Sequence, residues 1–171
     1  MVTETFRPLF HEIFAKVNNA KDKPKKVKVL KQYDSDGLRK LLKASFDPKI
    51  KWLLPEGDVP FIANDAPAGT EHSRLELEAR TFKNYVGVEQ QDGTIISGNE
   101  GLNRMKREML FISLLEGLTQ GEAEVLLAAK DNTLNKKYKG LNANTVKEAF
   151  NWDDEFMVKD RPELKKPSYP V

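Results

Sequence analysis

Apolar residues recur three and four positions apart along most of the chain, the spacing of one buried helix face. This pattern predicts helices over residues 3–18, 35–46, 74–86, 102–118 and 120–130, and a last helix from about 142 to 150. Residues 25–33 fit both patterns, because Val27 and Val29 alternate as in a strand whereas Val27, Leu30 and Tyr33 share a helix face. We favour a helix there.

Polar residues stand where several of these helices should begin. Thr3, Asp34 or Ser35, and Ser73 can each accept a hydrogen bond from a free amide of the first turn. Thr119 followed by Glu122 matches a capping box, in which the hydroxyl caps the Glu122 amide and the carboxylate reaches back. A helix over 120–130 should therefore follow the preceding helix almost without a linker.

The segment LNRMKREMLFISLLEGL, residues 102–118, has the strongest helical pattern in the chain. Its apolar stripe consists of Met105, Met109, Ile112, Leu115 and Leu118. Other apolar residues widen the stripe in the second half of the segment. This composition predicts a helix at the centre of the hydrophobic core.

Two glycine- or proline-containing stretches, 54–73 and 87–101, lack periodicity and predict long loops, the second with a small hairpin around Asp92-Gly93. After Trp152 the chain contains three prolines and mixed charge, which predicts an extended tail over 153–171. We therefore expect a mainly α fold: one orthogonal bundle of five to seven helices over residues 1–152, around central helix 102–118.

The amino-acid composition restricts the kinds of functional site that the protein can have more than it restricts the fold. The 171 residues are 39% hydrophobic and 32% charged and contain no cysteine, which excludes disulfides, thiolate metal sites and thiol nucleophiles. The amphipathic start MVTETFRPLFHEIF lacks the apolar run of a signal peptide, and no apolar run approaches the length of a membrane span. We expect no membrane association.

The net charge of +2 is spread unevenly. Residues 21–51 contain eleven lysines and arginines against four acids, a net +7, whereas residues 52–100 have a net charge of −6. The basic segment is a footprint for nucleic acid, a face that meets the acidic segment within the fold or between subunits, or a solvated lysine-rich face. The candidate binding residues are Lys25, Lys26, Lys28, Lys31, Arg39, Lys40, Lys43, Lys136, Lys137, Tyr138, Lys139 and Lys147. Tyr33, Trp52 and Tyr138 could stack on bases, or Trp52 and Tyr138 could belong to the core.

The stretch LTQGEAEVLLAAKDNTLNKKYKGLNANTVKEAF, residues 118–150, locally resembles the helix-turn-helix domain of quorum-sensing response regulators. In such a domain Lys136, Lys137, Lys139 and Lys147 would meet phosphates while the last helix enters a groove. This chain has a shorter spacing before NTVK, and Gly140 interrupts the second helix. These departures favour a helical hairpin with a lysine-rich connector.

A second similarity extends over residues 46–150. The motifs FDPKIKWLLPEGDVPF, APAGTEHSRL, KREMLFISLLEGL, AEVLLAAKD, KKYKGL and VKEAF occur in order. They resemble a family of small uncharacterised proteins of T-even-type contractile-tailed phages. The resemblance implies a phage origin and supplies no site residues.

Motifs for catalysis or metal binding are absent from the sequence. His11 and His72 lack the paired spacing of a metal site, and Glu71-His72-Ser73 is interpreted as the entry to a helix. GNEG at 98–101 lacks the lysine of a phosphate-binding loop. The consecutive acids at 153–155 cannot converge on one cation. We expect no catalytic residues, no metal and no cofactor.

These observations favour a non-enzymatic phage accessory protein that acts by binding in the host cytoplasm. Its partner would be DNA or RNA, or a phage or host protein of replication or transcription. The alternative is a structural or assembly component of the virion, whose tail and long loop contact neighbouring subunits. Sequence alone leaves the oligomeric state open.

Overall fold

A computed structural model describes residues 8–57, 59–62 and 73–152 of the chain. The elements are, in order, α1 (Phe10–Asn19), α2 (Lys23–Gln32), α3 (Asp36–Phe46), β1 (Ile50–Trp52), α4 (Leu75–Glu78), the 3₁₀-helix η2 (Ala79–Asn84), β2 (Val86–Glu89), β3 (Ile95–Ser97), α5 (Arg104–Glu116), α6 (Gln120–Lys130), α7 (Leu134–Lys137) and α8 (Ala143–Phe150). The prediction of a mainly α protein is confirmed. α4 and α7 are single turns, which leaves six longer helices among the described residues.

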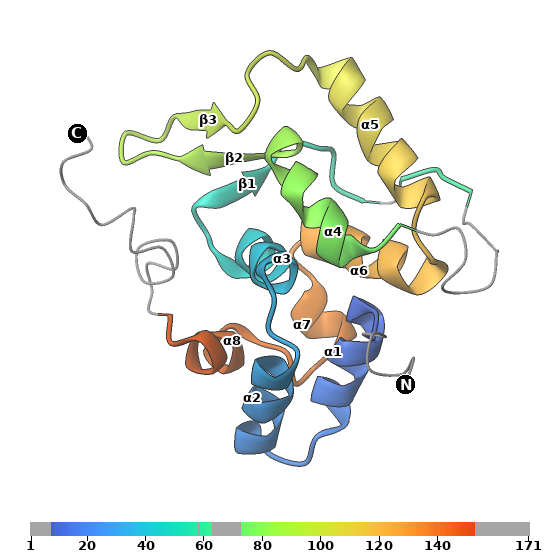
Figure 1. Ribbon diagram of the computed structural model, residues 1–171. Helices are drawn as coiled ribbons and strands as arrows, with labels where there is room; N and C mark the ends of the chain where they lie inside the picture. The colour runs from blue at the N-terminus through green and yellow to red at the C-terminus, as the bar shows by residue number, and fades with distance from the viewer. Residues whose placement is uncertain (1–7, 58, 63–72, 153–171) are drawn as a thin grey trace.

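The elements are arranged around α3 and α6 (Figure 1). A three-stranded antiparallel sheet in the order β1-β2-β3 lies above α3, and α1, α2 and α8 form the opposite end. α5 runs along the upper edge of the molecule. The predicted tail over 153–171, the cap Thr3 and the residues Glu71 and His72 lie outside the described residues.

Local sequence signals determine most helix starts. Ser35 and Asn142 accept hydrogen bonds from the amides of Leu38 and Thr145 at 3.1 and 3.0 Å, respectively. Asp22 caps α2, which confirms the helical interpretation of residues 25–33. By contrast, Ser73 does not cap α4, because Arg74 occupies the N-cap position and has no capping side-chain bond.

Strand β1 and its pairing with the hairpin are the main features that the sequence pattern did not predict. β1 pairs with β2 through Ile50↔Val88 and Trp52↔Val86, and the hairpin of β2 and β3 turns at Asp92-Gly93 as expected. The predicted helix 74–86 divides into α4, η2 and the start of β2, and the predicted loop 87–101 contains both hairpin strands. Strand pairing depends on distant partners, so three-residue strands carry little local signal.

The prediction that residues 102–118 form the central helix of the core is wrong. Met105 and Met109 are 73% and 61% exposed, and α5 buries only Phe111, Leu114 and Leu115. The core instead gathers around α1, α3 and α6, whose buried residues include Phe14, Leu41 and Leu126. A stripe of methionines on an edge helix cannot be distinguished by spacing alone from a stripe that faces the core.

The Glu122 side chain ties three helices together. The Glu122 amide donates to Thr119 Oγ1 at 3.3 Å, as the capping box predicts. The Glu122 carboxylate, however, does not turn back to the Thr119 amide. Instead Oε2 accepts from the Phe10 amide at 2.9 Å, and Oε1 accepts from the Leu75 amide at 3.0 Å. Glu122 is 1% exposed. One carboxylate on α6 therefore caps both α1 and α4.

Replacement of Glu122 by alanine should lower the free energy of unfolding by about 2–5 kcal/mol, because two buried amides lose their acceptor. Glu124→Ala is the matched control, since it changes the same residue type in the same helix at an exposed ion pair. Its effect should stay within about 0.5 kcal/mol. Urea denaturation followed by circular dichroism measures both. Equal losses would contradict the assigned role of Glu122.

The position of α5 predicts a contrast between two residues of the expected core stripe. Leu115→Ala should cost about 2–4 kcal/mol of stability, since Leu115 is fully buried. Met109→Ala should cost less than about 0.5 kcal/mol, since Met109 is largely in solvent. Urea denaturation of the two variants measures both losses. A large loss of unfolding free energy for Met109→Ala would show that this face of α5 is covered in solution.

Candidate nucleic-acid interface

The basic residues of α2 form an exposed ridge. Lys25, Lys28 and Lys31 are three residues apart, so they follow one side of the helix away from the buried Val27 and Leu30. Among the described residues, the three lysine side chains form no ion pair or hydrogen bond. They remain available to an anionic partner.

Several other predicted binding residues are engaged within the fold. Lys26 Nζ donates to the carbonyl oxygens of Val17 and Ala20 at 3.1 and 2.6 Å, so it caps the end of α1. Tyr138 is buried, with its ring 5.6 Å from that of Phe14. The structure thus contradicts the prediction that Lys26 and Tyr138 belong to a contact surface.

Trp52 and Arg39 are held in a similar way. Trp52 Nε1 donates to the Ala44 carbonyl oxygen at 2.9 Å, and its ring meets that of Phe82 at 5.8 Å, so it anchors the core. Arg39 Nε lies 2.7 Å from Asp34 Oδ1, and its guanidinium lies 4.8 Å from the centre of the Phe150 ring. Trp52 is therefore not free to stack on a base, and the partly exposed Arg39 guanidinium is already paired with Asp34.

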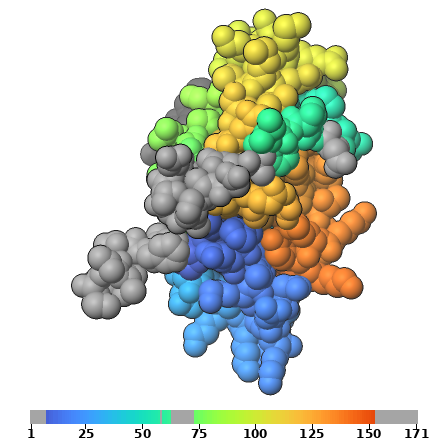
Figure 2. Space-filling model, turned by 90° about the vertical axis from the view of Figure 1, so that its right-hand side faces the viewer, coloured from blue at the N-terminus to red at the C-terminus, as the bar shows by residue number. Residues whose placement is uncertain are grey.

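The lysine-rich connector near α7 is only partly available. Lys136 and Lys139 are exposed and have no side-chain partner within the described part of the chain. Lys137 Nζ lies 3.3 Å from Glu124 Oε1, and Lys147 is half-buried on α8. Figure 2 shows long side chains of the blue and orange segments projecting from the lower half of the molecule.

The α6–α7–α8 segment departs from a helix-turn-helix as the sequence suggested. α7 is a single turn that ends at Lys137, before Gly140. α8 buries Thr145, Val146 and Phe150, and α8 lies against α2. Its exposed side carries Glu148, which pairs with Lys23 at 3.2 Å. An acidic side chain on the exposed face does not suit a helix that enters a groove.

A second cationic region lies between α3, η2 and the sheet. It is a solvent-open hollow of about 280 Å³ with an apolar floor that includes Ile50, Phe82 and Val88. Four basic residues surround the floor, Lys40 and Lys43 from α3 and Arg80 and Lys83 from η2. We call this region the cationic hollow. No acidic residue lines it among the described residues.

Three of these four cations are available for binding. Within the described ranges, Lys40, Arg80 and Lys83 are exposed and form no ion pair or side-chain hydrogen bond. Lys43 differs, because it is 2% exposed and its Nζ lies 5.1 Å from the centre of the Trp152 ring.

Sequence reasoning missed Arg80 and Lys83. They lie in the segment 52–100, whose average charge is negative, and charge averaged along the chain conceals cations that meet a basic helix in space. Gly98 brings the hairpin against η2 here, since a Cβ at Gly98 would lie 2.6 Å from the Lys83 carbonyl oxygen. The hollow therefore depends on tertiary contacts.

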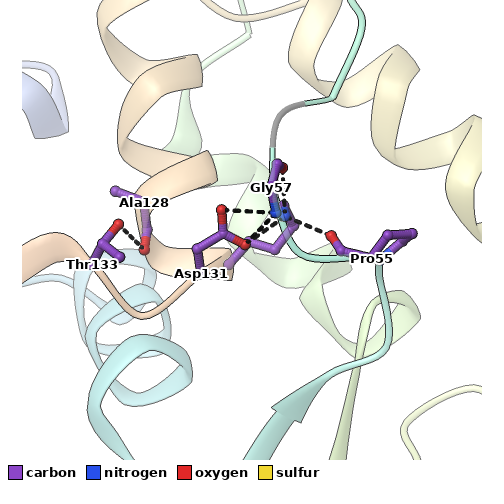
Figure 3. A network of polar contacts seen from close by, with 6 residues as sticks. Pro55, Gly57, Ala128, Asp131 and Thr133 are labelled. Atoms are coloured by element: carbon purple, nitrogen blue, oxygen red, sulfur yellow. Dashed lines mark hydrogen bonds and ion pairs between the residues drawn. The ribbon is translucent and has the colours of Figure 1, made fainter.

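A buried lysine fixes the loop after β1 to the end of α6. Figure 3 shows Pro55 and Gly57 of this loop beside Asp131. Lys130 Nζ donates to the carbonyl oxygens of Pro55 and Gly57 at 2.7 and 3.1 Å and lies 2.7 Å from Asp131 Oδ1. The Asp131 carboxylate in turn accepts from the Gly57 amide at 3.3 Å. This network holds part of the predicted loop 54–73 in one place.

Lys130→Met should release this loop, because it leaves two carbonyls without their donor and the Asp131 carboxylate without its ion-pair partner. We expect a loss of about 2–4 kcal/mol in unfolding free energy and faster cleavage after Glu56 by the protease Glu-C. Lys137→Met, at an exposed ion pair, is the control and should change neither. Unchanged cleavage in Lys130→Met would contradict the tether.

Burial changes the titration of two carboxylates. Desolvation raises the pKa of Glu122, although its two backbone hydrogen bonds and the nearby Arg74 and His11 oppose that shift. Desolvation also raises the pKa of Asp47, opposed by its hydrogen bond from the Lys49 amide. Within the described ranges no three acidic or histidine side chains converge as metal ligands would.

Comparisons with known proteins identify a family and no activity. A family model described as a family of unknown function (DUF6433) matches residues 13–136, well over half of the chain. No curated protein and no solved structure matches. The matched region contains the cationic hollow, whereas α8 lies beyond it. None of the helices in the described residues is long and apolar enough to cross a membrane.

Proposed function

We propose that this chain, which belongs to a family of unknown function (DUF6433), is a non-enzymatic protein that binds the phosphate backbone of nucleic acid at the cationic hollow. One observation carries the proposal. Lys40, Arg80 and Lys83 converge from two elements on one hollow, and no acid among the described residues lines it or pairs with them. Phosphate contacts of this kind supply affinity without base specificity.

The apolar floor supports the same function. Low-polarity walls concentrate the field of the surrounding cations, which strengthens the attraction of an anion over that of a flat lysine-rich face. The α2 ridge, with Lys25, Lys28 and Lys31, lies at the opposite end of the molecule from the sheet and would add a weaker, long-range electrostatic attraction. The resemblance to phage proteins makes an accessory role in the infected host cytoplasm part of the proposal.

Nucleic-acid binding should be strongly salt-dependent and should depend on the hollow. We expect fluorescence anisotropy with labelled single- and double-stranded DNA and RNA to detect binding at low salt that weakens steeply toward physiological salt. The double variant Lys40→Glu/Lys83→Glu should weaken binding about tenfold or more and reduce the salt slope by about one to two.

A matched variant separates local contacts from overall charge. Lys28→Glu/Lys31→Glu on the α2 ridge changes the net charge by the same amount at exposed positions. It should weaken binding less than the hollow variant does. If the ridge variant weakened binding more than the hollow variant, the binding site would be on the α2 ridge instead. Absence of binding at low salt would overturn the proposal and favour a protein partner, as in an accessory complex or a virion.

A further inference from the structure

The outer side of α5 is apolar and faces solvent. Met105, Met109 and Ile112 follow one another at spacings of four and three residues, so they lie along one side of the helix. Met105 and Met109 are largely exposed, and Ile112 is half-buried. We call these three residues the α5 stripe. Contiguous exposed apolar surface of this kind is typical of a contact site.

The loop after β1 widens the stripe. The Ile62 amide donates to Glu116 Oε2 at 3.3 Å, which holds residues 59–62 against the last turn of α5. The Ile62 side chain is 81% exposed. Figure 2 shows the green-blue loop beside the yellow and gold helix on one face of the molecule. The apolar surface therefore extends from α5 onto this loop.

An apolar cavity of about 210 Å³ opens between the loop and α5. It is lined by Leu54, Pro55, Val59, Pro60, Glu108, Phe111 and Ile112. Leu54, Val59 and Ile112 are partly exposed, so a side chain can reach the cavity from solvent. Ile112 also belongs to the α5 stripe, which places the cavity directly beside it. A flexible methionine side chain suits an irregular apolar space of this kind.

The spacing of the stripe suits a second copy of the same helix. Glu116 follows Ile112 by four residues, so the series from Met105 to Glu116 alternates steps of four and three, the repeat of helices that pack side by side. In an antiparallel pair, residues equally distant from the middle of this series meet. Met109 of each copy would then meet Ile112 of the other, next to the apolar cavity.

The charges at the two ends of α5 favour the same arrangement. Arg104 and Lys106 lie in its exposed first turn, and the exposed Glu116 is its last residue. Arg104 also pairs with Glu108 at 2.9 Å, whereas Lys106 forms no ion pair within the described residues. Antiparallel packing brings the basic first turn of each copy to Glu116 of the other, whereas parallel packing would bring like charges together.

We propose that the α5 stripe is the contact surface of a homodimer, in which two α5 helices pack antiparallel about a twofold axis and Met109 of each copy enters the apolar cavity of the other. One helix and one loop from each copy bury less than about 1,200 Å² in total, the range of weak specific interfaces. The dissociation constant should therefore be on the order of 10–100 μM. The dimer does not depend on nucleic-acid binding.

Sedimentation equilibrium of the full chain, from about 5 to about 500 μM, tests the dimer. The protein should show a reversible monomer–dimer equilibrium. Met109→Lys should weaken dimerisation about tenfold or more, because each dimer would bring two lysines into an apolar contact. At the low concentration of a circular dichroism experiment the chain would be monomeric, so Met109→Ala should still have its small effect on unfolding.

Leu77→Lys is the matched control, since Leu77 is a 60% exposed apolar side chain on α4 and does not line the cavity. It should change the dissociation constant less than about twofold. Equal weakening by Leu77→Lys and Met109→Lys would overturn the assigned surface. A monomer over the whole concentration range would overturn the dimer and leave a different molecule as the occupant of the stripe.

Charge reversal tests the antiparallel arrangement. Glu116→Arg alone and Arg104→Glu/Lys106→Glu alone should each weaken the homodimer, because like charges would then meet at both ends. Mixed in equal amounts, the two variants should form a heterodimer, in which opposite charges meet again at both ends. Native mass spectrometry separates the species by mass. Homodimers of wild-type strength would overturn antiparallel packing, and absence of the heterodimer would overturn the contact between these charges.

Discussion

The buried carboxylate of Glu122 is the contact on which the arrangement of helices depends. It accepts hydrogen bonds from the Phe10 and Leu75 amides, which are the first residues of α1 and α4. Free amides at a helix start carry partial positive charge, so one carboxylate stabilises two helix termini at once. The cost is desolvation, and this cost is why the pKa of Glu122 rises despite the two bonds.

Fixing α4 on α6 also places the remainder of the site. α4 continues directly into η2, and η2 carries Arg80 and Lys83 over the sheet opposite α3. Gly37 allows α3 to approach this unit, because the Glu76 carbonyl oxygen leaves no room for a side chain there. Arg80 and Lys83 thus derive their positions from a carboxylate that does not line the hollow.

The basic residues fall into two groups, those that hold the fold together and those whose charge is available to a partner. Lys26 and Lys130 satisfy backbone carbonyls, whereas Lys40, Arg80 and Lys83 surround an apolar floor without partners in the described residues.

Sequence by itself determined the mainly α class, the starts of α3, α6 and α8 and the Asp92-Gly93 turn, because caps and turns are interactions between residues close in the chain. It also indicated a basic footprint that includes Lys40. Only the tertiary structure decided that Met105 and Met109 face solvent, that β1 pairs with β2, that the Glu122 carboxylate leaves its own helix, and that Arg80 and Lys83 join Lys40. These features depend on residues distant in sequence, whose mutual approach no local pattern encodes.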